Sequence, residues 1–149
     1  MRENTEVDKG NYCLLINLDK DSRIKIGAKG VIHFKQGYYI YVGSALNTLS
    51  KRIERHLSND KKKHWHVDYL LLNKNTKIEE VIYSYSTKKI ECEISNEINK
   101  KSIDYIELFG CSDCNCTSHL YYFESYVDAL KSSIDSYKKI GYKPYTWFN

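Results

Sequence analysis

Residues 39–56, which read YIYVGSALNTLSKRIERH, constrain the fold of this chain more than any other segment. The first four are aromatic or β-branched, which favours a strand, and Gly43 marks a turn at its end. From Leu49 to Leu57 an apolar residue recurs at every fourth position with charged residues between, which is the pattern of an amphipathic helix. The segment therefore predicts a strand over 38–42, a turn at Gly43 and a helix over 47–57.

Other apolar stretches predict further elements of both kinds. Strands are expected at 12–18, 64–72, 81–86 and 119–123, and a hairpin at 23–26 and 31–34. Helices are expected over 90–101 and 127–140, the latter amphipathic with Val127, Leu130 and Ile134 on one side. The aromatic tail, 141–149, is expected to pack back. These elements describe one α+β domain over residues 1–149, with a small central mixed or antiparallel sheet flanked by helices.

The composition is that of an ordinary globular protein. The 149 residues are 42% hydrophobic, and the net charge of +4 permits an anionic partner without requiring one. No apolar run approaches the roughly 20 residues that cross a bilayer, and residues 1–12 lack the apolar stretch of a signal peptide. We therefore expect a cytoplasmic protein with no membrane partner. The odd count of five cysteines argues against a disulfide framework in such a protein.

Four motifs follow one another along most of the chain: YVGSA at 41–45, HWHVDYL at 64–70, ECE at 91–93 and FGCSDCNCTSHL at 109–120. In this order they resemble a little-characterised branch of the GIY-YIG nuclease superfamily, a branch described as a domain of unknown function. Gly10-Asn11-Tyr12 takes the place of the first Gly-Ile-Tyr element, and Tyr41-Val42-Gly43 takes that of the second. The resemblance implies a GIY-YIG-like fold and a metal-dependent endonuclease that hydrolyses DNA with Mg²⁺ or Mn²⁺.

The tyrosines of the two elements acquire roles from this resemblance. Tyr12 would be the base or the water-orienting residue, and Tyr41 would lie near the nucleophile. A phenol acts as a base only when a nearby cation lowers its pKa, which is normally about 10. The interval between the two elements is longer than is usual in the superfamily, because residues 23–34 look like an inserted hairpin. Tyr39 is therefore an alternative to Tyr12.

Three further residues complete the catalytic set that the resemblance implies. Arg52 would stabilise the pentavalent phosphate, since a guanidinium offers planar, bidentate contacts to phosphate. His56, one helical turn later, would transfer a proton or hold phosphate. Glu91 would be the carboxylate ligand of Mg²⁺, with Glu93 as the fallback. A first-turn carboxylate favoured by the helix dipole is the structural alternative for Glu91.

A basic and histidine-rich segment follows the predicted helix. The candidates for contact with nucleic acid are Lys61, Lys62, Lys63, His64 and His66. The alternative for the lysines is a solvated loop. On the strand expected at 64–72, His64, His66 and Asp68 would share one face. That face would bind a transition metal, form a polar cluster across the sheet, or touch phosphate in the cleft.

Cysteine and histidine side chains near the end of the chain have the types that bind zinc. The candidate ligands are Cys92, Cys114, Cys116 and His119. The loop at 109–118 is rich in Gly, Ser and Asp and can bury little apolar surface, so a bound metal would explain an ordered conformation. The alternative is a loop of reduced thiols that lines the site, with Asp113 and His119 as polar contributors.

Two other functions remain open beside the endonuclease. One is a non-catalytic nucleic-acid-binding module that retains the fold, and the other is a zinc-stabilised interaction domain. Geometry separates them, because a nuclease of this type requires Tyr41, Arg52 and Glu91 to converge on one cleft.

Overall fold

The computed structural model describes residues 8–110 and 116–148, and its core is a six-stranded antiparallel sheet. The strand order is β6-β7-β4-β1-β5-β8. The strands of this sheet are β1 (Gly10–Leu18), β4 (Gly37–Ala45), β5 (Thr76–Tyr85), β6 (Asp104–Tyr105), β7 (Leu120–Phe123) and β8 (Tyr145–Thr146). The described α-helices are α1 (Leu49–Leu57), α2 (His66–Leu71), α3 (Glu91–Asn99) and α4 (Tyr126–Lys139). The predicted α+β class is confirmed, and the sheet is antiparallel.

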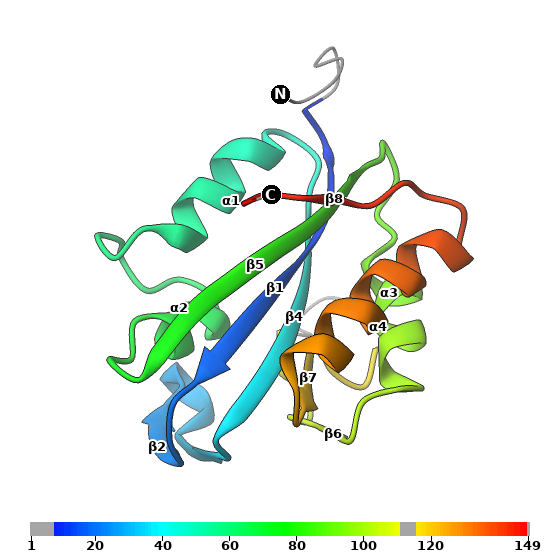
Figure 1. Cartoon of the computed structure of the whole chain (residues 1–149). Helices are drawn as coiled ribbons and strands as arrows, with labels where there is room; N and C mark the ends of the chain where they lie inside the picture. The colour runs from blue at the N-terminus through cyan, green and yellow to red at the C-terminus, as the bar shows by residue number, and fades with distance from the viewer. Residues whose placement is uncertain (1–7, 111–115, 149) are drawn as a thin grey trace.

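Helices cover both faces of the sheet (Figure 1), with α1 and α2 on one side and α3 and α4 on the other. Strand β1 shows why two cores form. Tyr12 and Leu14 face the core beneath α1 and α2, whereas Cys13 and Leu15 face the core beneath α3 and α4. Successive side chains of a strand point to opposite faces, so an apolar run such as β1 can fill both cores.

The expected hairpin forms a small sheet of its own. Strands β2 (Ser22–Lys25) and β3 (Val31–Phe34) pair with each other, joined by the 3-10 turn η1 (Gly27–Lys29). This hairpin is inserted where Leu18 pairs with Gly37, at one end of the β1–β4 ladder. Tyr12 pairs with Gly43 near the opposite end. The insertion therefore adds residues between the two tyrosine elements, but it does not separate Tyr12 in space from the second element, Tyr41-Val42-Gly43.

The strand predicted at 64–72 is wrong, because residues 66–71 form helix α2. Polar and apolar residues alternate in this segment, and six residues are too few for periodicity to distinguish a helix from a strand. The carboxylate of Asp68 accepts hydrogen bonds from the backbone N–H groups of His64 and Trp65, at 2.8 and 2.9 Å. These bonds satisfy amide groups at the start of the helix, which stabilises it locally.

The apolar side predicted for the last helix is only partly buried. Val127 is 67% exposed, although Leu130 and Ile134 pack against the core at its edge. The fully buried positions of α4 are small or polar, apart from one tyrosine: Ala129, Ser132, Ser133, Ser136 and Tyr137. Small side chains allow α4 to lie close to its neighbours, and Ser133 and Ser136 donate their hydroxyls to carbonyls of the preceding turn.

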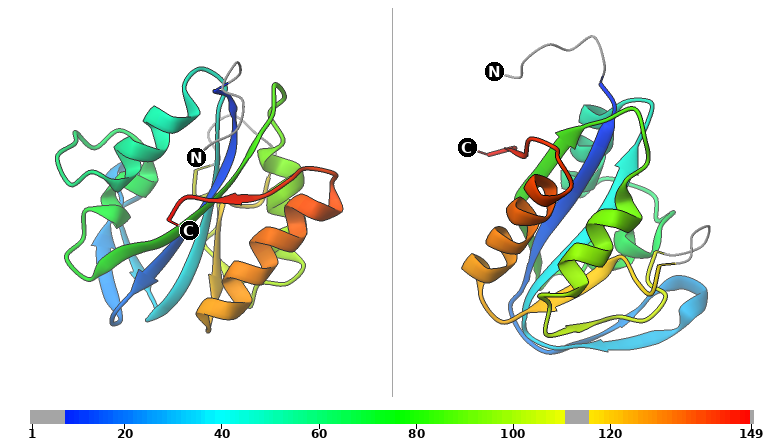
Figure 2. Two further views of the ribbon diagram at one scale, coloured as in Figure 1. Left: turned by 45° about the horizontal axis from the view of Figure 1, so that its top comes forward. Right: turned by 90° about the vertical axis from the view of Figure 1, so that its right-hand side faces the viewer.

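The aromatic tail packs back as predicted. Tyr145 and Thr146 form β8, which pairs with β5. Figure 2 shows the tail, in red, crossing over β5. Tyr145 stacks on Tyr83 with a distance of 5.6 Å between ring centroids. No helix among residues 8–110 and 116–148 is long and apolar enough to cross a membrane.

Candidate active site

A cleft of about 410 Å³ opens at the end of the sheet where β4 leads towards α1. Four of the five predicted catalytic residues line it: Tyr12, Tyr41, Arg52 and Glu91. They come from β1, β4, α1 and the first position of α3. Other residues of its wall are Gly43, Ser44, Leu46, Trp65, Lys89 and Gly110. The convergence required of Tyr41, Arg52 and Glu91 is therefore present.

Gly43 makes room for the ring of Tyr12. A Cβ atom at Gly43 would lie 2.5 Å from Cζ and from Oη of Tyr12, closer than real side chains allow. Tyr39, the alternative first tyrosine, lies elsewhere. Its ring packs against Phe34 and Tyr122, and its hydroxyl donates to the carbonyl of Lys35 at 2.7 Å. The structure thus places Tyr12, and not Tyr39, in the cleft.

His56 lies behind Tyr12 rather than in the wall of the cleft. The hydroxyl of Tyr12 and Nε2 of His56 are 2.7 Å apart, and His56 is 2% exposed. Burial lowers the pKa of His56 to about 3, so its imidazole is neutral at physiological pH. Burial likewise raises the pKa of the Tyr12 phenol well above 10, although the charge of Arg52 lowers it in part. The phenol is therefore protonated and the imidazole neutral, and a hydrogen bond joins Oη of Tyr12 to Nε2 of His56.

Trp65 holds Arg52 at the cleft. The Cζ atom of Arg52 lies 4.6 Å from the centre of the Trp65 ring, and Nη1 donates to the carbonyl of Ser44 at 3.2 Å. A cation over an indole face is attracted by the ring quadrupole. Trp65 was not predicted as a site residue, although it belongs to the HWHVDYL motif.

Arg55 contacts the same indole but has a different role. Its guanidinium lies 4.4 Å from the Trp65 ring and donates to both carboxylate oxygens of Asp68, each at 3.0 Å. Burial alone would raise the pKa of Asp68, but these bonds and those from Trp65 and His64 outweigh it and lower the pKa. This ion pair joins α1, which carries Arg55, to α2, which carries the fully buried Asp68.

The predicted shared face of His64, His66 and Asp68 does not exist, because the segment is helical. Asp68 is committed to Arg55, His64 is exposed, and Nδ1 of His66 accepts a hydrogen bond from the N–H of Gly110 at 3.2 Å. Burial, followed by the nearby charge of Lys29, lowers the pKa of His66, which suits an accepting nitrogen. A transition-metal site made of these three residues is therefore ruled out.

The predicted basic contacts separate into two groups. Lys61 donates to the backbone carbonyls of Arg55 and His56, at 3.3 and 2.7 Å, and so caps the end of α1. Burial is the main reason that the pKa of Lys61 is lowered. Lys62 and Lys63 are exposed, with the ammonium of Lys63 5.1 Å from the centre of the Tyr69 ring.

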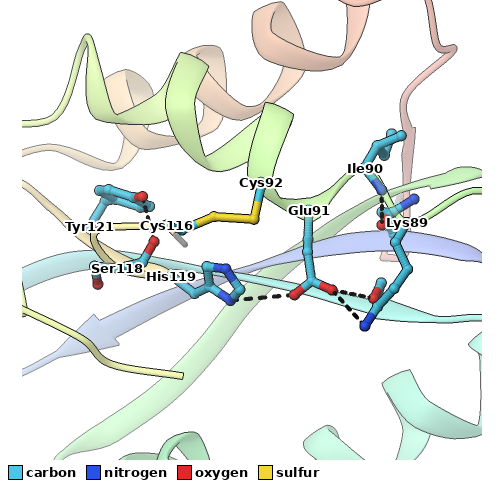
Figure 3. The surroundings of a disulfide bond; sticks show 10 residues. Lys89, Ile90, Glu91, Cys92, Cys116, Ser118, His119 and Tyr121 are labelled. Atoms are coloured by element: carbon cyan, nitrogen blue, oxygen red, sulfur yellow. Dashed lines mark hydrogen bonds and ion pairs between the residues drawn. A yellow bond between two sulfur atoms is a disulfide. The ribbon is translucent and has the colours of Figure 1, made fainter. Parts of the chain in front are cut away.

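Glu91 is surrounded by polar groups from Ser44, Lys89 and His119, none of which was predicted as its partner. Ser44 donates its hydroxyl to Oε1 at 2.6 Å, and Nζ of Lys89 lies 3.7 Å from the same oxygen. Nδ1 of His119 lies 3.4 Å from Oε2. Figure 3 shows Glu91 between His119 and Lys89. Glu93, the fallback ligand, is exposed and is not part of the cleft wall.

A disulfide joins Cys92, the second residue of α3, to Cys116, which precedes β7. Figure 3 shows this bond beside Glu91 and His119. The two Cα atoms are 5.9 Å apart. The argument against disulfides from the odd cysteine count is therefore wrong for this pair, because an odd count excludes only the pairing of every cysteine. Ligand atoms of Cys92, Cys116 and His119 lie within 4.8 Å of one another, so this group could hold a metal ion. Cys114, the remaining predicted ligand, and Asp113 lie outside the described residues.

Comparison with known proteins places the chain in a family. No curated protein matches the chain, and no solved structure matches it. A family model described as "Domain of unknown function DUF123" matches residues 11–142, which include every described residue of the cleft and of the cysteine–histidine group. The chain therefore belongs to the family of the domain of unknown function DUF123.

Proposed function

We propose that this protein is a metal-dependent endonuclease of the GIY-YIG type that hydrolyses phosphodiester bonds of DNA. The observation that carries the proposal is the convergence of Tyr12, Tyr41, Arg52 and Glu91 on one cleft. Two hydroxyls, a guanidinium and a carboxylate are the groups that such a hydrolysis needs for proton transfer, charge stabilisation and metal binding.

Glu91 fits a hard divalent cation. Its carboxylate lines the cleft, and the 3.4 Å contact of Oε2 with His119 is too long to be a strong hydrogen bond, so this oxygen retains lone pairs for a ligand. Mg²⁺ binds proteins through one or two carboxylates and keeps several waters. Lys89 is exposed and would have to turn away from Oε1. A bound Mg²⁺ or Mn²⁺ would activate water and neutralise phosphoryl charge.

The phenol of Tyr12 would orient the attacking water rather than act as a stored phenolate. Its raised pKa keeps it protonated, and its hydroxyl lies 2.7 Å from Nε2 of the neutral imidazole of His56, which holds the phenol from behind. Burial lowers the pKa of His56 to about 3, so this imidazole is a poor final acceptor for a proton of the water.

Arg52 would hold the phosphate that is attacked. Its guanidinium is fixed by the indole of Trp65 on one side and the carbonyl of Ser44 on the other. A fixed planar donor loses little entropy when it binds two phosphoryl oxygens. Tyr41, which is buried beside His56, adds a second hydroxyl near the nucleophile.

DNA is the substrate that we propose, and Lys62, Lys63 and His64 are the exposed groups that would contact its backbone. They are close in sequence to Trp65 in the cleft wall. The cytoplasm is the location that we propose. Soft sulfur and imidazole donors make Zn²⁺, and not Mg²⁺, the ion that we propose for the group of Cys92, Cys116 and His119.

The test is cleavage of branched, single-stranded and duplex DNA with Mg²⁺ or Mn²⁺. Arg52→Ala and Glu91→Ala should each lower the cleavage rate by about 100-fold or more. Glu93→Ala is the matched control, since this exposed glutamate lies in the same first turn of α3 and should cut like the wild type. Equal cutting by wild type and Glu91→Ala would overturn the proposal. Salt-sensitive binding without any cutting would favour the non-catalytic binding module instead.

A further inference from the structure

The disulfide and a buried histidine meet directly beside the cleft. Cys92 follows Glu91 in the first turn of α3, and Cys116 and His119 lie in the segment that enters β7. His119 is 1% exposed and Cys116 is 8% exposed, whereas Cys92 is half-buried. One side chain, His119, lies close both to the carboxylate of Glu91 and to the two sulfur atoms.

We propose that Cys92, Cys116 and His119 form a redox-gated site for a soft divalent cation such as Zn²⁺, which binds when the disulfide is reduced. Two thiolates and an imidazole within 4.8 Å of one another supply three ligands of the types that zinc prefers. A tetrahedral ion would have its fourth position open to water. The disulfide and the metal exclude each other, since sulfur atoms bonded to each other carry no thiolate charge.

A dithiol is the reductant that we propose for the Cys92–Cys116 disulfide. The dithiol breaks the S–S bond and transfers two electrons and two protons, which leaves thiols at Cys92 and Cys116 and a disulfide on the reductant. Binding of Zn²⁺ then displaces the two thiol protons into solvent, because the thiolate is the ligand. Oxidation by a small disulfide reverses both steps and releases the ion.

Metal binding at this site would change the electrostatic environment of Glu91. Cys92 is its neighbour in the chain, and His119 is the group 3.4 Å from its Oε2 atom. An ion that engages the imidazole of His119 changes the charge facing Glu91. This step rests on the proposed function, in which Glu91 binds the catalytic cation, whereas the zinc site itself does not depend on it.

The experiment measures metal binding without DNA. The full chain is reduced anaerobically, freed of reductant, and titrated with Zn²⁺ and, separately, with Co²⁺, whose thiolate complexes absorb in the near ultraviolet. Reduced wild type should bind one ion per chain with a thiolate-to-Co²⁺ band. The oxidised protein should bind neither metal at this site and should yield a linked Cys92–Cys116 peptide by mass spectrometry.

Variants assign the ligands. Cys92→Ser and His119→Gln should each weaken Zn²⁺ binding by about 100-fold or more. Cys13→Ala is the matched control, because Cys13 is a buried free thiol in the core and should leave binding unchanged. Cys111→Ser/Cys114→Ser retains the three proposed ligands and should still give the Co²⁺ band. Loss of the band in this double variant, or equal binding by the reduced and oxidised wild type, would overturn the inference.

These outcomes are separable from the nuclease test. Zinc binding with no DNA cleavage would support the site and remove only its link to Glu91. Cleavage without redox-dependent zinc binding would leave the endonuclease standing and overturn the gated site.

Discussion

The hydroxyl of Tyr12 lies 2.7 Å from Nε2 of His56, so a group in the cleft is joined to a buried neutral imidazole. The two residues are 44 positions apart and belong to β1 and α1. Gly43 of β4, which pairs with Tyr12, leaves the space that the phenol ring occupies. Three elements thus fix the position of one phenol.

Gly43→Ala should displace the ring of Tyr12. The new methyl group would lie 2.5 Å from the phenol, so we expect a loss of about 1–3 kcal/mol in the free energy of unfolding, measured by urea denaturation. In a Tyr12→Ala background the clash is absent, and the same substitution should cost much less. Equal costs in both backgrounds would contradict the packing described for this pair.

Acid should destabilise the protein through His56. Burial lowers the pKa of His56 from 6.5 to about 3, so between these values the unfolded chain binds a proton that the folded protein excludes. The contribution of His56 to the free energy of unfolding is constant above pH 6.5. The free energy of unfolding should fall below that pH by up to about 1.4 kcal/mol per pH unit, until about pH 3.

His56→Gln provides the comparison, since glutamine does not titrate. Its free energy of unfolding should depend less on pH between 6.5 and 4 than that of the wild type. The carboxyl of Asp68, whose pKa is lowered, loses its stabilising ionised form only at still lower pH in both proteins. Identical slopes for the two proteins in this window would mean that His56 is not the group responsible.

Substitution of Arg52 should mainly reduce activity, whereas substitution of Arg55 should mainly reduce stability. Both guanidiniums contact Trp65, but only Arg55 pairs with the fully buried Asp68. Arg55→Ala leaves a buried carboxylate without this partner and should lower the free energy of unfolding by about 2–4 kcal/mol. Arg52→Ala should cost at most about 1.5 kcal/mol, while DNA cleavage is lost. Thermal unfolding and cleavage of the two proteins, measured side by side, would reveal a reversed pattern if these roles are wrong.

Reduction should destabilise the metal-free protein. The disulfide closes a segment with a sequence separation of 24, and a crosslink of this span restricts the unfolded chain by about 3 kcal/mol. Urea denaturation in the presence of a chelator, with and without a reductant, measures the difference. Cys92→Ser should show no effect of the reductant, and Zn²⁺ added to reduced wild type should restore part of the lost stability.

Local patterns were sufficient for much of the fold. Strands β1 and β4 and helices α1 and α3 were predicted because each has a run long enough to show its period. Helix α2 was missed because it is short and starts with a side-chain cap from Asp68 rather than with a periodic run. The buried face of α4 could not be predicted from its apolar residues, because close packing favours its serines over Val127.

The sequence by itself determined the α+β class, since the periodicity of apolar residues along the chain distinguishes strands from helices. Its resemblance to GIY-YIG nucleases singled out four residues that line the cleft. Only the tertiary structure decided that Tyr12 and not Tyr39 enters the cleft, and that Trp65 holds Arg52. It also brought Ser44, His119 and the Cys92–Cys116 pair to Glu91 and its helix. These contacts join residues that are distant in sequence, and the packing of helices on both faces of the sheet sets their distances.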